Sequence, residues 1–211
     1  LNGNILDSDA QAVTNLTLTG STITNFTGLE AFVNVVNLNL GNNSFATVPL
    51  SNLTLLETLK INDNDLLASL DVSQNVLLKS IDVESNTSVN VTIPPITTLD
   101  LSNNVALESV RIVSFNNLSN VILPVTPTLT SINITRIADP TLDFSLISGL
   151  ETLTISGSFV PVTITLPNIY TNLNVLTIQS IDIPLIVISN YINLEQISFS
   201  NTDVETLLLP N

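Results

Sequence analysis

The sequence has 211 residues and contains no cysteine, histidine, methionine or tryptophan. Without histidine and cysteine, the chain lacks the commonest general base and the most reactive side-chain nucleophile. Only four lysines and arginines stand against 18 aspartates and glutamates, which gives a net charge of −14. Because no cationic stripe exists to meet phosphate groups, we expect no nucleic-acid partner. We also expect no enzymatic activity.

Long apolar runs are missing as well. A membrane-spanning helix needs roughly 18 or more apolar residues in succession, and the most apolar stretch, residues 181–192, is interrupted by polar residues and a proline. No basic and then apolar leader opens the sequence. We therefore expect no direct membrane insertion. The chain begins in mid-pattern and stops without a polar cap, so we expect it to be a fragment of a larger protein.

What the sequence does contain is repetition. A pair of apolar residues separated by one residue recurs in steps of 22, 21, 22, 29, 22, 21, 23 and 21 residues. This alternation puts both apolar side chains on one face of a short strand. We interpret the single long step as an inserted loop within a constant period. The pairs are Leu16/Leu18, Leu38/Leu40, Leu59/Ile61, Ile81/Val83, Val110/Ile112, Ile132/Ile134, Leu153/Ile155, Leu176/Ile178 and Ile197/Phe199.

A second alternating segment follows about eleven residues after most of these pairs. The pattern predicts a β-rich, right-handed solenoid of the α/β class, with about nine coils of 21–23 residues, two short parallel strands per coil and few or no long helices. The predicted second strands lie at residues 48–50, 70–72, 99–101, 121–123, 142–144, 164–166 and 207–209.

The residue between the two apolar residues of each first strand points to the opposite face, toward water. These residues form a polar row that we predict to be the binding surface. The charged members of the row weaken a comparison with ice-binding solenoids, which need regular threonine arrays. The row is Thr17, Asn39, Lys60, Asp82, Arg111, Asn133, Thr154, Thr177 and Ser198.

Asparagines recur at the turns that follow the strands. An asparagine side chain has two donors and one acceptor, so it can pair backbone groups at a buried turn and repeat as a ladder. Asn43, Asn64 and Asn86 follow first strands, whereas Asn75 and Asn104 follow second strands. We predict that the ladder fades from the fifth coil on, where the corresponding positions are Phe115, Ile137, Ser158, Ile181 and Thr202.

Residues 56–64 and 69–75, which read LETLKINDN and SLDVSQN, resemble the leucine-rich repeats of secreted and cell-surface proteins of Bacteroidetes, especially flavobacteria. The phrase Thr27-Gly28-Leu29-Glu30 is similar to the first coil of that family, where a short helical turn follows. The resemblance implies a leucine-rich-repeat solenoid, displayed on the cell surface or secreted as a cargo of the type IX secretion system. It is strongest over residues 12–115.

The whole chain, residues 1–211, is expected to form a single leucine-rich-repeat domain. We assign residues 1–34 to an N-terminal capping region and first coil, and residues 35–84 to regular repeats. Residues 85–98 form the inserted loop, and residues 99–211 form less regular repeats.

Two alternatives involve carboxylates. Paired acids, Asp63 with Asp65 or Asp82 with Glu84, could serve general acid–base chemistry, but such residues in repeat proteins are usually solvated surface positions. A degenerate calcium loop is a second alternative, with Asn2, Asn4 and Asp9 as ligands. We interpret it rather as a capping turn and expect no other cofactor.

Our leading hypothesis is a non-catalytic module on the bacterial cell surface, either extracellular or on the outer membrane, that binds a protein or a glycan in adhesion. The alternative is a structural or accessory subunit of an exported assembly, such as a secretion or gliding-motility adhesin complex. Other subunits of that complex would then be its partners.

Overall fold

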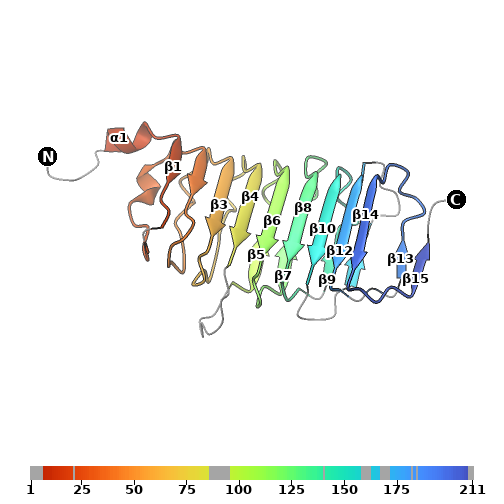
Figure 1. The fold of residues 1–211 in the computed structure, drawn as a ribbon. Coiled ribbons are helices and arrows are strands. Elements are labelled where there is room, and N and C mark those ends of the chain that lie inside the picture. The colour runs from red at the N-terminus through yellow and green to blue at the C-terminus, as the bar shows by residue number, and fades with distance from the viewer. Residues whose placement is uncertain are drawn as a thin grey trace.

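The computed structural model describes residues 7–20, 22–85, 96–139, 141–157, 163–166, 172–181, 183 and 185–208. The chain winds into an elongated solenoid with its two ends at opposite tips (Figure 1). The main sheet has nine parallel strands in chain order, joined by eight turns of the coil. These strands are β1 Asn15–Thr17, β2 Asn37–Asn39, β3 Thr58–Asn62, β4 Ser80–Glu84, β6 Ser109–Val113, β8 Ser131–Thr135, β10 Thr152–Ser156, β12 Val175–Gln179 and β14 Gln196–Ser200.

Alternation of apolar and polar residues explains why these segments form strands. In β3, Leu59 and Ile61 are fully buried, while Lys60 between them is exposed. The same inward pairs repeat in the following strands through β12, and they stack into one continuous core. All nine apolar pairs predicted from the sequence lie in or directly at the end of main-sheet strands.

The inserted segment leaves the register of the main sheet intact. Strands β4 and β6 pair directly, with Asp82 opposite Arg111, although their sequences are 29 residues apart. Residues 86–95 of the predicted loop lie outside the described residues. The register therefore continues across the long step, and the same five-residue pairing repeats as far as β14.

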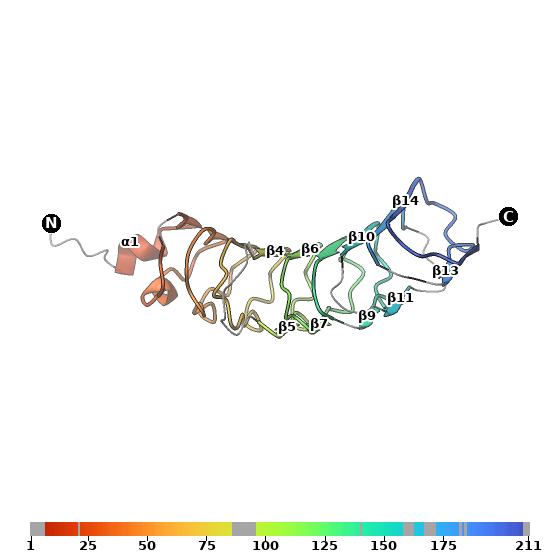
Figure 2. The ribbon, with the colours of Figure 1, turned by 60° about the horizontal axis from the view of Figure 1, so that its bottom comes forward.

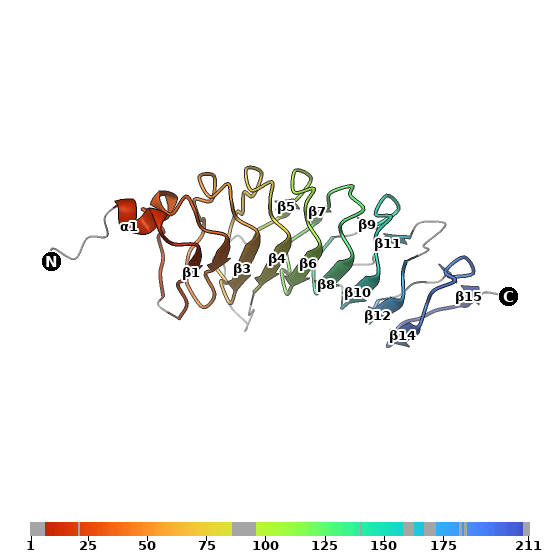
Figure 3. The ribbon, with the colours of Figure 1, turned by 90° about the horizontal axis from the view of Figure 1, so that it is seen from above.

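Short strands line the opposite side of the coil, as Figures 2 and 3 show. They pair only two by two, as β5 with β7, β9 with β11 and β13 with β15. The strands are β5 Thr98–Asp100, β7 Asn120–Ile122, β9 Thr141–Asp143, β11 Thr163–Thr165, β13 Leu185–Val187 and β15 Thr206–Leu208.

The prediction of two strands in every coil is wrong for residues 48–50 and 70–72, which form no strand. Pro49 has no N–H group to donate to a ladder. The carbonyl of Val72 accepts hydrogen bonds from Asn75 N and Asn104 Nδ2, so it needs no strand partner. Strand β13 was not predicted, because residues 185–188 are apolar throughout and show no alternation.

In the part of the chain that the structure describes, helices occur in the N-terminal region alone. Helix α1 spans Asp7–Gln11, and the 3₁₀ helix η1 spans Leu29–Ala31. Gly28 precedes η1 with φ of 101°, a left-handed conformation that glycine adopts without steric cost. A short helical turn was expected after the Thr-Gly-Leu-Glu phrase, and η1 is such a turn, although it begins within the phrase at Leu29. Within the described ranges, no helix has the length and apolar character needed to cross a membrane.

Candidate functional site: the outward face of the main sheet

The sheet register brings the nine predicted face residues into one row. Each is the direct lateral partner of the next, from Thr17 opposite Asn39 to Thr177 opposite Ser198. All nine side chains are exposed or half-buried. The geometry thus provides a continuous polar surface, and its role in binding stays a prediction.

Two further rows flank the central one, because residues two positions away along a strand share its face. One of these rows consists of the first residue of each main-sheet strand. Within it, hydrogen bonds join neighbouring coils: Asn37 Nδ2 donates to Asn15 Oδ1 at 2.7 Å, and Ser109 Oγ donates to Ser80 Oγ at 2.9 Å. These residues were missed in the sequence, although an offset of two residues from the central row would have found them.

A cluster of charges occupies the middle of the face. Arg111 Nη1 lies 2.7 Å from Asp82 Oδ1 and 2.8 Å from Glu84 Oε2. Lys60 Nζ lies 3.7 Å from Asp82 Oδ2. Partial burial alone would lower the pKa of Arg111, but its hydrogen bonds to the two carboxylates outweigh this effect and raise the pKa. The cluster thus joins two cations to two carboxylates, so its formal charges balance.

The C-terminal half of the face is uncharged. On β8, β10, β12 and β14 every outward position is a hydroxyl or amide residue apart from one valine. The face is thus divided into a charged centre and a neutral part that offers both donors and acceptors. The neutral positions are Ser131, Asn133, Thr135, Thr152, Thr154, Ser156, Val175, Thr177, Gln179, Gln196, Ser198 and Ser200.

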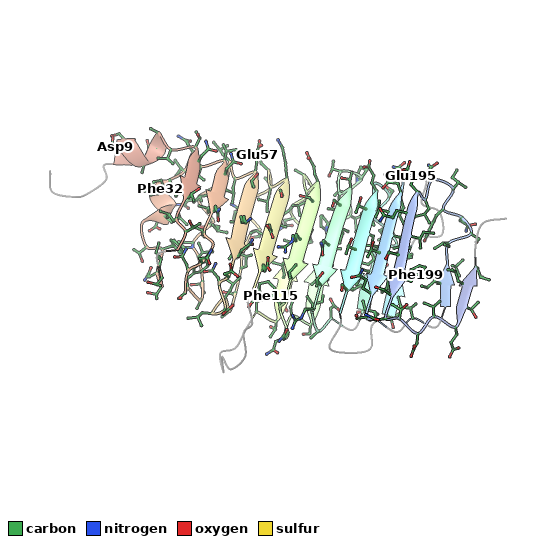
Figure 4. The ribbon with its side chains drawn as sticks, in the orientation of Figure 1. Asp9, Phe32, Glu57, Phe115, Glu195 and Phe199 are labelled. Carbon is green, nitrogen blue, oxygen red and sulfur yellow. The ribbon has the colours of Figure 1, made fainter. Side chains whose placement is uncertain are left out.

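Carboxylates also line the edge where the main-sheet strands begin, and Glu57 and Glu195 mark it in Figure 4. Lys79 Nζ binds Glu57 Oε2 there at 2.9 Å. The hydrogen bond from Lys79 to Glu57, together with the negative charges of Glu57 and Glu108, raises the pKa of Lys79. This ion pair is exposed to solvent, with side chains 47% and 38% exposed, and stands apart from the cluster on the face.

Three of the four carboxylates considered for acid–base chemistry have side-chain partners. Asp82 and Glu84 both accept hydrogen bonds from Arg111. Asp65 Oδ1 accepts a hydrogen bond from Ser85 Oγ at 3.0 Å, and Asp63 lies in the turn after β3 with φ of 55°. These contacts fit the interpretation of the acids as structural and surface groups.

The first asparagine ladder bonds backbone groups of neighbouring coils. Asn43 Nδ2 donates to the carbonyls of Leu18 and Leu40, and its Oδ1 accepts from Ile23 N at 3.0 Å. Asn64 Nδ2 repeats the contact one coil later, with the carbonyl of Leu40 at 3.0 Å. The predicted third member, Asn86, lies outside the described residues.

The second ladder is buried more deeply. Asn75 Nδ2 donates to the carbonyls of Leu50 and Leu53 at 3.0 and 2.8 Å, and both Asn75 and Asn104 have no exposed surface. In later coils the positions that correspond to the first ladder are buried apolar residues, Phe115, Ile137 and Ile181. Thr202 is half-buried, and Ser158 lies outside the described residues.

One structural carboxylate was missed in the sequence. Asp139 is 3% exposed, and its Oδ2 accepts from Val121 N at 2.8 Å while its Oδ1 accepts from Thr141 N at 3.0 Å. Val121 lies in β7 and Thr141 in β9, two strands that do not pair with each other. The side chain therefore bridges an interruption on the back of the solenoid. An aspartate two residues before a strand is a weak signal for such a bridge.

The suggested calcium ligands are not assembled in the described part of the chain. Asp9 is an exposed residue of α1, whereas Asn2 and Asn4 lie outside the described residues. Among the residues that the structure describes, no group of three or more acidic side chains comes together in a way that could hold a metal ion. The calcium loop stays a prediction.

A solved structure with the same architecture identifies the fold. The functional domain of InlJ from Listeria monocytogenes, described as including a cysteine ladder, matches 94% of this chain with a TM-score of 0.63 and 22% identity. The chain is a leucine-rich-repeat solenoid. This leucine-rich-repeat chain covers 46% of the length of the InlJ domain, or about half of it. This chain contains no cysteine, and its buried ladders are made of asparagine.

A second internalin, inlF from Listeria monocytogenes str. 4b F2365, has a TM-score of 0.42 and 18% identity over 98% of this chain and 83% of its own. No protein-family model and no curated protein matches the sequence. At these identities the likeness concerns the fold alone, and function has to be argued from the surface.

Proposed function

We propose that this leucine-rich-repeat chain is a non-catalytic interaction module that binds a protein partner through the outward face of its main sheet. One observation carries the proposal, the unbroken row of nine laterally paired polar side chains from Thr17 to Ser198. A wide, rigid and polar surface of this kind suits an extended partner, because its positions are fixed by the backbone ladder.

The charged centre of the face supports a protein as the partner. Arginine is enriched at the energetic centre of protein interfaces, and Arg111 is held in place by Asp82 and Glu84 while remaining 38% exposed. A fixed guanidinium loses little conformational freedom on binding, which favours affinity. A glycan is the second kind of partner that the neutral part of the face would suit.

Display at the cell surface and a role in adhesion are part of the same proposal. They are supported by the likeness to a Listeria internalin domain and by the resemblance of the repeats to secreted and surface proteins of Bacteroidetes. Export by the type IX secretion system is a further proposal, which rests on the same resemblance to Bacteroidetes proteins.

The proposal can be tested with the triple variant Lys60→Ala, Asp82→Ala and Arg111→Ala. The wild-type chain and the variant are screened against an array of purified extracellular proteins and glycans. Lys79→Ala is the matched control, because it changes the net charge by the same one unit outside the face. We expect the triple variant to lose at least tenfold in affinity for the wild-type targets and the control to retain it. Equal binding by the wild type, the triple variant and the control would show that the charged centre of the face does not take part in binding.

A structural role in an exported assembly is a second proposal, and the exposed interior of the last described coil favours it. Leu207 of β15 is 38% exposed, whereas its register partner Ile186 of β13 is 3% exposed. Ile197 of β14 is 41% exposed, whereas its partner Leu176 is fully buried. Unpaired strand edges with apolar side chains are surfaces that another domain can cover. If a second copy of the chain covers this edge, the copies should stack end to end. Sedimentation of the chain as a monomer up to high concentration would count against such stacking.

A further inference from the structure

A surface hollow of about 340 Å³ lies between the first two coils, outside the main sheet. It is formed by segments 24–30 and 46–49, in the orange part of the solenoid in Figure 1. Its volume is at the lower end of the range for small-molecule sites. The residues that matter for its chemistry are Thr24, Asn25, Phe26, Glu30, Thr47 and Pro49.

Two polar side chains of the hollow are held in place by local hydrogen bonds. Asn25 Oδ1 accepts from Thr27 N and from Thr27 Oγ1, both at 2.7 Å. Glu30 Oε2 accepts from Gly28 N at 2.9 Å. Each side chain thus uses one oxygen to fix its own position. The amide Nδ2 of Asn25 and the second oxygen of Glu30 stay available to a ligand as a donor and an acceptor.

Apolar groups complete the lining. Phe26 is 6% exposed, and its ring packs edge-on against that of Phe45, with ring centroids 4.9 Å apart. This packing fixes the ring as a rigid part of the wall. Pro49 adds a second apolar surface, while Thr24 and Thr47 contribute hydroxyl groups. The hollow therefore combines fixed hydrogen-bonding groups with apolar carbon surface in a small volume.

This combination matches the chemistry of a sugar ring, which carries hydroxyl groups on its rim and C–H groups on its faces. An anionic ligand is disfavoured, because Glu30 lines the hollow and the chain carries a net charge of −14. We propose that the hollow binds one uncharged hexose ring, with Glu30, Asn25 and Thr47 bonding its hydroxyl groups. The hollow is separate from the main-sheet face, so this proposal can be tested independently of the proposed protein interface.

The test is a titration of the isotopically labelled chain with the methyl glycosides of glucose, galactose, mannose and N-acetylglucosamine, followed by amide NMR. We expect at least one glycoside to shift the amide signals of residues 24–30 and 46–49 in a saturable manner. Failure of all four to bind would overturn the proposal, as would saturable shifts confined to other residues. An oligosaccharide ending in the same hexose then separates the two sources: tighter binding indicates a glycan terminus, and equal binding indicates a free sugar.

Two variants test the assigned groups. Asn25→Asp keeps the oxygen that accepts from Thr27 N, as Asp71 does for Ser73 N at 2.9 Å, but removes the Nδ2 donor. Thr47→Val removes a hydroxyl at nearly constant volume. Each variant should weaken binding about tenfold, the equivalent of one hydrogen bond to a ligand. The control is Thr98→Val on β5, an exposed threonine on the back of the solenoid, which should bind like the wild type. Unchanged affinity in both hollow variants would contradict the assignment, and unchanged thermal unfolding shows that they fold.

Discussion

Arg111 on β6 and Asp82 on β4 are register partners, and the distance of 2.7 Å between Arg111 Nη1 and Asp82 Oδ1 spans the step that contains the inserted segment. A chain that has added several residues between two coils thus keeps the same lateral contact as its other coils. The ion pair lies on the face and not in the core, since the two side chains are 38% and 25% exposed. We therefore expect it to contribute little to stability, and the proposed interface assigns it to recognition.

The first prediction follows from this exposure. Arg111→Ala should lower the free energy of unfolding by no more than about 1 kcal/mol, because ion pairs near the surface contribute little once solvent screening is included. Urea unfolding of the wild type and the variant measures the difference. A loss of several kcal/mol would show that the cluster holds the solenoid together and is not chiefly a recognition element.

The second prediction concerns the buried asparagine ladder. Asn104 Nδ2 donates to the carbonyls of Val72 and Asn75, both at 2.9 Å, and Asn104 has no exposed surface. Asn104→Ala leaves these carbonyls without that donor and should cost about 2–4 kcal/mol. Its neighbour Asn103 is exposed, and Asn103→Ala should cost less than about 0.5 kcal/mol. Similar losses in the two variants by urea unfolding would contradict the ladder.

The third prediction uses two glycines. A Cβ atom on Gly149 would lie 1.8 Å from the carbonyl oxygen of Pro127 in the preceding coil, so Gly149→Ala forces the backbones of two coils apart. We expect a loss of at least about 3 kcal/mol. Gly20 has φ of +68° but open space around it, so Gly20→Ala should cost only about 1–2 kcal/mol of backbone strain. The reverse order of the two losses in thermal unfolding would contradict this packing.

The fourth prediction is a pH dependence. Hydrogen bonds from the backbone and side chain of Ser73 lower the pKa of Asp71, and Ser102 and Ser145 lower the pKa of Asp100 and Asp143, chiefly through their side chains. A pKa lowered on folding contributes stability above the unfolded value of 3.8, and the contribution is lost as the pH falls through the folded value.

The triple variant Asp71→Asn, Asp100→Asn and Asp143→Asn should therefore lose less stability than the wild type between pH 7 and pH 3, since the amide keeps an acceptor but does not titrate. The matched control replaces Asp9, Asp63 and Asp203 by asparagine. It removes as many carboxylates without touching an aspartate–serine turn. Parallel pH profiles for the triple variant and the wild type would refute the role of these turns.

The sequence contained most of what determines the main sheet. Pairs such as Leu59 and Ile61 must both face the core, and a slip of one residue would expose them, so the register and the face residue Lys60 follow directly. The back of the coil was less predictable. There, backbone groups are hydrogen-bonded by neighbouring strands in some coils and by buried asparagine side chains in others. The alternation of apolar and polar residues does not show which of the two occurs in a given coil.

The candidate site was predictable in position but not in chemistry. The central row followed from alternation, whereas the partition of the face into a charged centre and a neutral part depends on which coils are neighbours after the inserted segment. The hollow near Asn25 and Glu30 depends on turns between strands, for which the repeat offers no template. The bridge from Asp139 to Val121 joins residues 18 apart and likewise required the structure.

The central claim is that the outward face of the main sheet is the binding surface, and footprinting of a complex tests it most directly. The chain is labelled by hydroxyl radicals alone and with the tightest protein target from the array, and the protected side chains are located by mass spectrometry. We predict protection at Lys60, Arg111 and the β8–β12 face, with the exposed Leu146 on the turn after β9 labelled equally in both samples. Protection of the turns and back strands with an unchanged sheet face would contradict the claim.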